Sequence, residues 1–213
     1  MYKAVLGAAA LLLFSTIGFA QPKAAIDITD AQIKEVLKFA PPAVDQQLRV
    51  IDMGTYQLAV GIIHRGPTGQ AAGRGEGAGR GRGRGAAPAN MQKCGEQMSS
   101  VPGNAPGGIA HDDTTETYVI VSGGGTLVTG GHIVNGFRSG PESEVTKILN
   151  GPSCSGRMVG DVVSRKVGLH DVIVIPAGVP HGWSDIPDHV DYLSVRPDEK
   201  KVLEHGYVNP HIK

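Results

Sequence analysis

Two histidines and one glutamate have the residue types and the spacing of a metal centre. His111 and Glu116 lie close together in the chain, and His181 follows in a separate segment. Each segment is short, β-forming in composition and bounded by glycine or proline. Two neutral imidazoles and one carboxylate suit iron, manganese, zinc or nickel, and three protein ligands leave coordination positions open for a substrate. The sequence therefore predicts one divalent transition metal at these residues.

The coordination position next to these three ligands is open to three interpretations. Water is the simplest candidate. His64, on a preceding β-forming segment, and Asp113, two residues after His111, are the alternatives within the chain. An open metal position can polarise a carbonyl group, activate water or bind dioxygen, so the sequence does not select the reaction type.

Two stretches of the chain resemble the two motifs of the cupin superfamily. The first family motif reads G-x5-H-x-H-x3-4-E-x6-G, and the second reads G-x5-P-x-G-x2-H-x3-N. The matching positions are Gly103, His111, Glu116, Gly123, Pro176, Gly178 and His181. The positions that differ are Ile109 for the first histidine, His170 for a glycine and Asp185 for the asparagine.

The resemblance covers residues 46–197 and implies both a fold and a range of functions. The implied fold is all-β, a double-stranded β-helix or cupin jelly-roll barrel. The implied functions are dioxygenase-, isomerase- or lyase-like reactions on a small organic molecule, and cupin barrels often pair through their sheets into homodimers. Because Ile109 replaces a ligand histidine, the alternative is a non-catalytic small-ligand binding or sensing protein that has partly or wholly lost its metal.

Strand parity predicts which side chains surround the metal. Residues two apart in a strand point to the same face, so each ligand shares a face with its second neighbours. This places four further residues in a substrate pocket: Ile109, Tyr118, Ile120 and Trp183. A mostly apolar wall with a few convergent polar groups is typical of small-ligand sites. Tyr118 is the candidate catalytic acid or base, and a pocket-wall aromatic is the other interpretation.

Short β-forming segments separated by turn residues predict the scaffold. The expected strands are 48–51, 56–64, 117–122, 126–129, 132–134, 145–149, 162–167, 172–175 and 192–195. Gly123-Gly124-Gly125 and Gly130-Gly131 are typical of turns between them. Many short strands with almost no helix favour a sandwich or barrel, and composition alone leaves an immunoglobulin-like sandwich open beside the barrel of the resemblance.

One short helix is expected before the strands. Thr29 and Gln32 have the spacing of a capping box, apolar residues then recur at helical spacing from Ile33, and Pro41 ends the segment. The expected organisation is a signal peptide over 1–20, a helical extension over 21–45, a barrel over 46–197 and a tail over 198–213. Residues 66–90, rich in glycine and arginine, predict a disordered surface insert that cannot form a core.

Charge and targeting signals limit the partners. Lys3, an apolar run and small residues up to Ala20 predict a secretory signal cleaved after Ala20, and therefore a periplasmic or secreted protein without stable membrane insertion. A net charge of zero gives no support for nucleic acid as a partner. In an exported chain, Cys94 and Cys154 are a candidate disulfide, with two free thiols as the alternative.

Overall fold

The computed structural model describes residues 22–41, 43–68 and 91–213. The segment predicted as a secretory signal and most of the glycine- and arginine-rich insert lie outside these residues. Among the helices within the described ranges, none is long and apolar enough to cross a membrane.

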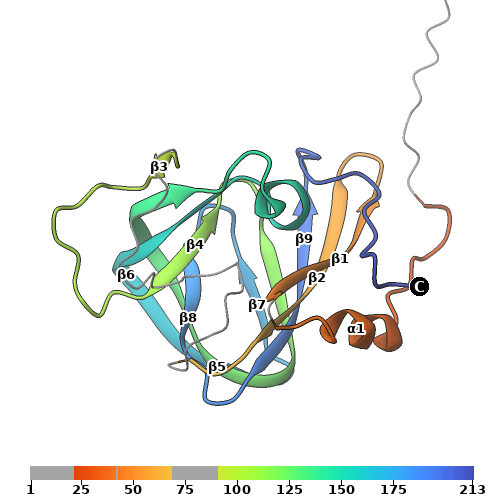
Figure 1. Cartoon of the computed structure of the whole chain (residues 1–213), viewed down its shortest axis with the longest axis horizontal. Coiled ribbons are helices and arrows are strands. Elements are labelled where there is room, and N and C mark those ends of the chain that lie inside the picture. Colours follow the sequence, from red (N-terminus) through yellow and green to blue (C-terminus); the bar gives the residue numbers. More distant parts are fainter. Residues whose placement is uncertain (1–21, 42, 69–90) are drawn as a thin grey trace, which may run out of the picture.

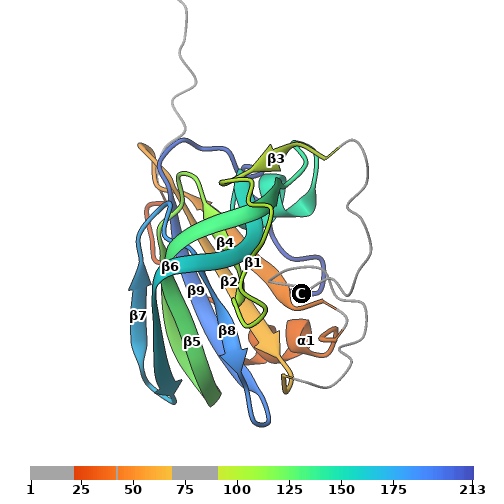
Figure 2. The same cartoon turned by 90° about the vertical axis from the view of Figure 1, so that its left-hand side faces the viewer.

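Strands in two antiparallel sheets enclose the interior of the protein (Figures 1 and 2). The strands of the first sheet are β1 (Asp45–Asp52), β2 (Gln57–Arg65), β7 (Val172–Ile175) and β9 (Val190–Asp198). The strands of the second are β3 (Lys93–Cys94), β4 (Gly107–His111), β6 (Ser153–Gly168) and β8 (His181–Asp185). The long strand β5 (Glu116–Arg138) belongs to both sheets and joins them. The predicted all-β barrel with a short N-terminal helix is confirmed.

Strand β5 corrects the prediction of hairpin turns at its glycines. Its first part pairs with β7 and β9, and its second part pairs with β6 and β8. Gly123 and Gly131 have φ values of +65°, and a Cβ at either position would come within 2.2 Å of a backbone carbonyl oxygen. These glycines therefore bend a continuous strand from one sheet into the other, as bulges do, and three predicted strands merge into one.

Two further segments differ from the sequence prediction. Residues Val145–Leu149, predicted as a strand, form one wide helical turn, η1, in which Val145 O accepts hydrogen bonds from the backbone of Asn150 and Gly151. Its apolar residues Val145 and Leu149 are four apart, a spacing that suits a helical turn as well as a strand. Strand β6 is longer than predicted because pairing with β4 and β5 extends it to Ser153.

The helix α1 (Asp30–Leu37) lies against the outer side of β1 and β2 (Figure 1). Thr29 caps it as predicted: its Oγ1 accepts from the backbone of Gln32, whose side chain accepts from the Thr29 N–H. Val36 is fully buried and packs against Leu48 and Ile62. The helix thus covers one face of the first sheet and leaves the interior of the barrel to the strands.

The space between the sheets is divided into an apolar core and a polar end. Ile63, Ile120, Leu127, Ile175 and Tyr192 are among the buried side chains that fill the apolar part. Strands β4, β5 and β8 each begin or end at the polar end. Their terminal side chains therefore meet there.

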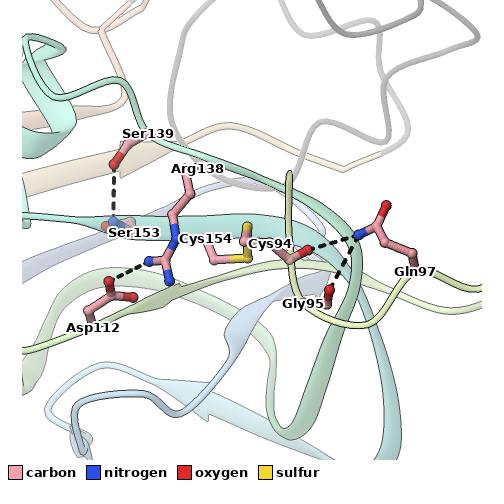
Figure 3. The surroundings of a disulfide bond; sticks show 8 residues. All are labelled: Cys94, Gly95, Gln97, Asp112, Arg138, Ser139, Ser153 and Cys154. Carbon is pink, nitrogen blue, oxygen red and sulfur yellow. Dashed lines mark hydrogen bonds and ion pairs between the residues drawn. A yellow bond between two sulfur atoms is a disulfide. The ribbon is translucent and has the colours of Figure 1, made fainter. Parts of the chain in front are cut away.

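A disulfide joins Cys94 of β3 to Cys154 of β6 (Figure 3). Cys154 is paired in register with Ala110 of β4 and with Arg138 of β5. The cross-link therefore stabilises the start of β6, where it pairs with β4 and β5. This position is next to Ser153, which contacts the site described below.

Candidate metal centre

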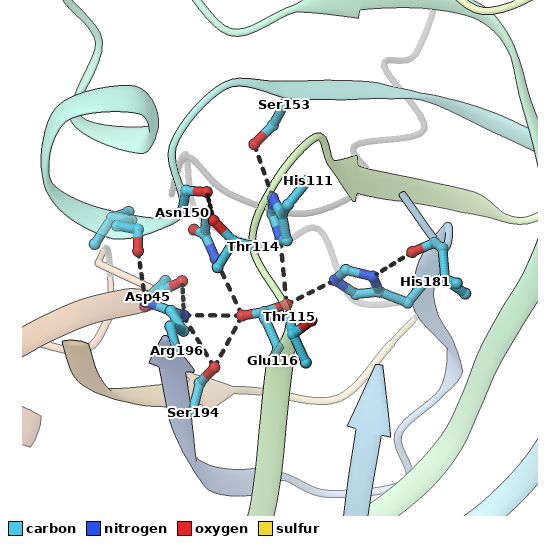
Figure 4. A network of polar contacts seen from close by, with 12 residues as sticks. Asp45, His111, Thr114, Thr115, Glu116, Asn150, Ser153, His181, Ser194 and Arg196 are labelled. Atoms are coloured by element: carbon cyan, nitrogen blue, oxygen red, sulfur yellow. Dashed lines mark hydrogen bonds and ion pairs between the residues drawn. The ribbon is translucent and has the colours of Figure 1, made fainter. Parts of the chain in front are cut away.

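The three residues predicted as metal ligands converge at one end of the barrel (Figure 4). His111 ends β4, Glu116 begins β5 and His181 begins β8. One ligand atom from each lies within 4.8 Å of the other two, and all three residues are at least 96% buried. The backbone N–H of Gly178 donates to His111 O at 2.7 Å, so the turn before β8 is tied to the end of β4.

A hydrogen bond sets the tautomer of His111. Its Nδ1 lies 2.7 Å from Ser153 Oγ, and that hydroxyl donates its own proton to Gly151 O at 2.8 Å. The hydroxyl oxygen can therefore only accept, and Nδ1 of His111 carries the proton. In the neutral imidazole, Nε2 is then left with a lone pair. That lone pair points at Glu116 Oε2, 3.1 Å away.

His181 has the same arrangement. Its Nδ1 donates to the carbonyl oxygen of Val179 at 3.0 Å, and its Nε2 lies 3.0 Å from Glu116 Oε2. Two imidazole lone pairs and a carboxylate oxygen thus face one another in a buried site. Such a group of electron-pair donors requires a cation or added protons. Backbone or side-chain acceptors at the second ring nitrogen are typical of metal-bound histidines.

The donor set also fits a transition metal in its dimensions. Neighbouring ligands of an octahedral ion with bonds of about 2.1 Å are about 3.0 Å apart, and those of a tetrahedral ion slightly further. The two Nε2–Oε2 separations, 3.1 Å and 3.0 Å, are compatible with this spacing and are also ordinary hydrogen-bond lengths. Burial lowers the pKa of His111 although Glu116 acts against it, which favours the neutral imidazole that a metal requires.

Glu116 is held as a carboxylate by neighbouring donors. Its Oε1 accepts from Asn150 Nδ2 at 3.0 Å, Ser194 Oγ at 2.8 Å and Arg196 Nε at 2.9 Å. Burial alone would raise the pKa of Glu116, but His111 and Arg196 outweigh it and hold that pKa well below its usual range. One oxygen is thus fixed by the protein, and the other faces the two imidazoles.

Arg196 is the centre of the network behind Glu116. Its side chain is 1% exposed, and besides Glu116 and Ser194 it donates to Gln47 Oε1, Leu149 O and Asp45 Oδ2. Although burial works against its charge, Asp45 and Glu116 raise the pKa of Arg196 above its usual value. A permanent buried cation therefore fixes the position and the charge of the carboxylate.

Tyr118 contacts the same carboxylate from the apolar side. Its hydroxyl donates to Glu116 Oε2 at 2.9 Å. Burial, with Glu116 next, raises the pKa of Tyr118 well above its usual value. The phenol is therefore a neutral donor to Glu116. This contact gives no evidence that Tyr118 accepts a proton, and its catalytic role stays a prediction.

A cavity of about 30 Å³ adjoins the three residues. Ile109, Tyr118 and Trp183, three of the residues predicted to surround a substrate, line it together with Arg65 and Tyr192. Ile120 does not line it. Its side chain is completely buried in the apolar core, because its position on β5 lies two residues further from the site than Tyr118. The predicted pocket wall was wrong at this residue.

The two alternative protein ligands lie elsewhere. His64 Nδ1 pairs with Asp191 Oδ1 at 2.6 Å, and Asp113 pairs with Lys200 Nζ at 2.6 Å near the surface. Neither belongs to the cluster of metal-ligand atoms found among the described residues. Ile109, where the family has a histidine, lines the cavity instead.

Several residues of the site were missed by sequence reasoning: Asp45, Arg65, Asn150, Ser153, Tyr192, Ser194 and Arg196. A signal for some of them was present. Residues of β9 alternate between buried and partly exposed, so Tyr192, Ser194, Arg196 and Asp198 share the inward face. When the other inward-facing residues of a strand suit a buried core, an inward-facing arginine indicates a buried carboxylate partner.

The barrel and the buried His–Glu–His cluster agree with the resemblance of the two sequence motifs to cupins. The protein therefore has the architecture of a cupin-type β-barrel. Neither a protein-family model nor a curated protein sequence matches the chain.

Similar solved structures include three distant proteins. A Bacillus halodurans protein is 11% identical over 89% of this chain and 92% of its own, with a TM-score of 0.39. Oxalate oxidase in complex with the substrate analogue glycolate is 12% identical, with a TM-score of 0.33 over 75% of this chain, which spans about half (54%) of that protein. The cysteine peptidase Peruvianin-I from Thevetia peruviana latex is 9% identical over 93% of this chain and 83% of its own, with a TM-score of 0.31.

Proposed function

We propose that this chain is an exported cupin-type metalloprotein. It binds one divalent transition metal through His111, Glu116 and His181 and acts on a small organic molecule. The observation that carries the proposal is the convergence of two imidazole lone pairs on a carboxylate oxygen, with both Nδ1–H groups already donated to other acceptors. This arrangement needs a cation or added protons, and the chemistry of the donors suits iron, manganese, zinc or nickel.

The surrounding residues have defined roles in such a site. A bound metal would supply Lewis-acid or oxygen-binding chemistry at its open positions. Arg196 and Asn150 keep Glu116 ionised and oriented, and Ser153 orients His111. Ile109 contributes an apolar wall and no ligand, which leaves more positions open to a small molecule than four protein ligands would. Dioxygenase-, isomerase- and lyase-like reactions are all compatible with this set.

A non-catalytic binding or sensing protein is the second candidate. The observation that favours it is Ile109, because an apolar side chain at a usual ligand position weakens the hold on a metal. The small volume of the cavity suits a tightly held ligand as well as a substrate.

Export is part of the proposal. Its support is the apolar segment that ends at Ala20 and the disulfide between Cys94 and Cys154, a type of cross-link that persists in oxidising compartments. Fractionation of cells that express the full chain, with N-terminal sequencing of the mature protein, tests it. A cytoplasmic protein that begins at Met1 would contradict export.

Pairing into a homodimer stays a prediction from the cupin resemblance. Light scattering of the purified protein over a range of concentrations tests it, and a monomeric mass throughout would contradict it.

Elemental analysis tests the metal centre. The protein is purified without a chelator or a histidine tag, beside the double variant His111→Ala/Glu116→Ala. The matched control is Glu96→Ala/His132→Ala, which removes an exposed histidine–glutamate pair with a 3.4 Å contact on the surface. We expect one transition metal per chain in the native protein and in the control, and none in the double variant.

The identity of that metal narrows the reaction class. Iron or nickel favours oxygen chemistry, and zinc or manganese favours Lewis-acid chemistry. Absence of metal from the native protein, even after reconstitution, would contradict the proposal and leave the ligand-binding alternative.

A further inference from the structure

Arg65, at the end of β2, brings a positive charge to the wall of the cavity. Its Nε donates to the hydroxyl of Tyr192 at 2.9 Å, which fixes the plane of the guanidinium group. Among the ion pairs within 4.0 Å that the described residues form, none involves Arg65. A partly buried guanidinium that faces a cavity without such a partner has donors available for a ligand.

Tyr192 provides a second available donor beside Arg65. Its hydroxyl oxygen accepts from Arg65 Nε and, at 3.4 Å, from Trp183 Nε1. With two donors directed at this oxygen, its own proton must point elsewhere. Within the described ranges, the hydrogen bonds of the structure give this proton no acceptor, and the residue lines the cavity. Arg65 and Tyr192 therefore place available donors side by side at the cavity wall, positioned by their contact with each other and by that of Tyr192 with Trp183.

The charge around the site favours an anion. Two carboxylates, Asp45 and Glu116, are balanced by two guanidinium groups, Arg65 and Arg196, with the ligand histidines neutral. A divalent metal would bring the sum from zero to a net positive charge of two. Bound metal ions are often the largest local charge in a site, so the loaded cavity would attract a negatively charged molecule.

We propose that the cavity takes a small organic carboxylate, whose carboxylate group is bound by Arg65 and Tyr192. The proposal rests on the metal-binding function proposed above and names the chemical class of its substrate or ligand. A planar guanidinium group matches a carboxylate in geometry. The apolar walls from Ile109 and Trp183 suit a short carbon chain, and a volume of about 30 Å³ limits the ligand to a few heavy atoms unless the cavity widens.

Titration calorimetry with acetate and acetamide tests this proposal. The two probes have nearly the same shape, and only acetate carries a charge. The full chain is first loaded with zinc, and its zinc content is measured. We expect acetate to bind and acetamide to bind at least about tenfold more weakly, because hydrogen bonds to charged groups are about twice as strong as neutral ones. Equal binding of the two probes would overturn the proposal.

Variants of Arg65 locate the effect. Arg65→Gln should weaken acetate binding by about tenfold or more with zinc content unchanged, and Arg65→Lys should recover part of the loss because it keeps the charge. Arg165→Gln, which removes an exposed arginine of β6, is the matched control and should bind acetate as the native protein does. Native affinity in Arg65→Gln would also overturn the proposal.

The zinc content separates the two proposals. Failure of the native protein to hold zinc or another transition metal would contradict the metal centre itself. A stoichiometric metal with acetate binding that is absent, or insensitive to Arg65, would contradict only the carboxylate proposal. If Arg65→Gln fails to fold, the comparison of acetate with acetamide in the native protein and in Arg65→Lys still decides the question.

Discussion

Two histidine–carboxylate groups in this protein have similarly short contacts but differ in chemistry. In the candidate metal centre, His111 and His181 turn their Nε2 atoms towards Glu116 and donate their Nδ1 protons to oxygens elsewhere. In the second group, His64 turns Nδ1 directly to Asp191 at 2.6 Å. Both carboxylates lie within hydrogen-bond distance of a ring nitrogen, but only the second contact is explained by a single proton on the ring.

The comparison shows that the hydrogen bond made by one ring nitrogen of an imidazole determines what the other ring nitrogen can bind. In the first group, Ser153 and Val179 accept the Nδ1 protons, so the Nε2 lone pairs face the carboxylate. Such an arrangement requires a cation or added protons. The ring of His64 is also 28% exposed, so water can satisfy its other nitrogen. Proximity of a histidine to a carboxylate is therefore a weak indicator of a metal, and the second hydrogen bond is a stronger one.

The largest effect expected from this comparison is on metal content. His181→Ala should remove a ligand and weaken metal binding by more than the roughly 10- to 100-fold that loss of an orienting contact causes. His64→Ala should leave metal content unchanged. Elemental analysis of both variants after dialysis against metal-free buffer measures this. A stoichiometric metal in His181→Ala, or its loss from His64→Ala, would reverse the assignment of the two groups.

A large effect on stability is expected at Arg196. Replacement by methionine keeps the length of the side chain but leaves the buried Glu116 and the largely buried Asp45 without their shared cationic partner. Loss of one member of a buried ion pair costs about 3–5 kcal/mol, so the urea midpoint should fall strongly. The control is Lys200→Met at the exposed pair with Asp113, where about 0–1 kcal/mol is expected. Equal costs for the two variants would mean that the buried network contributes little.

A smaller effect is expected at Ser153, which only orients a ligand. Ser153→Ala removes the acceptor of the His111 Nδ1 proton and should weaken metal affinity by about 10- to 100-fold. Ser164→Ala, at an exposed position of the same strand β6, is the matched control. Competition with a chelator of known affinity measures both variants. Unchanged affinity in Ser153→Ala would show that the tautomer of His111 is set by another contact.

The sequence predicted the ligand triad because its signals are local. Each ligand sits at a strand end beside a turn residue, such as Gly178 before His181, and short-range patterns predict such positions well. Strand β7 and the capped helix at Thr29 were predicted for the same reason. The continuous strand β5 was not, because glycine triplets are typical of turns and only pairing with two different sheets keeps that strand extended.

The residues behind the ligands escaped prediction because their partners are distant in the chain. Arg196 contacts Asp45 and Glu116 only after β1, β5 and β9 have assembled, and no local spacing links these positions. Ile120 was misplaced for a related reason: strand parity gives the correct face, but it does not give the depth at which a side chain leaves the cavity and enters the core.

The last and smallest expected effect is the pH dependence of stability without metal. The pKa of His111 is lowered from 6.5 by burial, so an unfolded chain takes up a proton at this residue at a higher pH than the folded chain does. The free energy of unfolding should therefore fall as the pH decreases below about 6.5. Glu116, whose pKa is held well below 4.5, should add a second loss as the pH falls below about 4.5. Each pH unit contributes at most about 1.4 kcal/mol per group.

Urea unfolding of the chelator-treated protein at several pH values measures these losses. His111→Gln should remove the dependence near pH 6.5 that comes from this residue and reduce, without abolishing, the dependence below about 4.5, because Arg196 still lowers the pKa of Glu116. The comparison with the native protein uses the slope of stability against pH, so a constant cost of the substitution cancels. An unchanged slope in His111→Gln would mean that His111 binds its proton equally in the folded and unfolded chains, and a change in slope of the opposite sign would mean that the buried ring is protonated in the folded, metal-free protein.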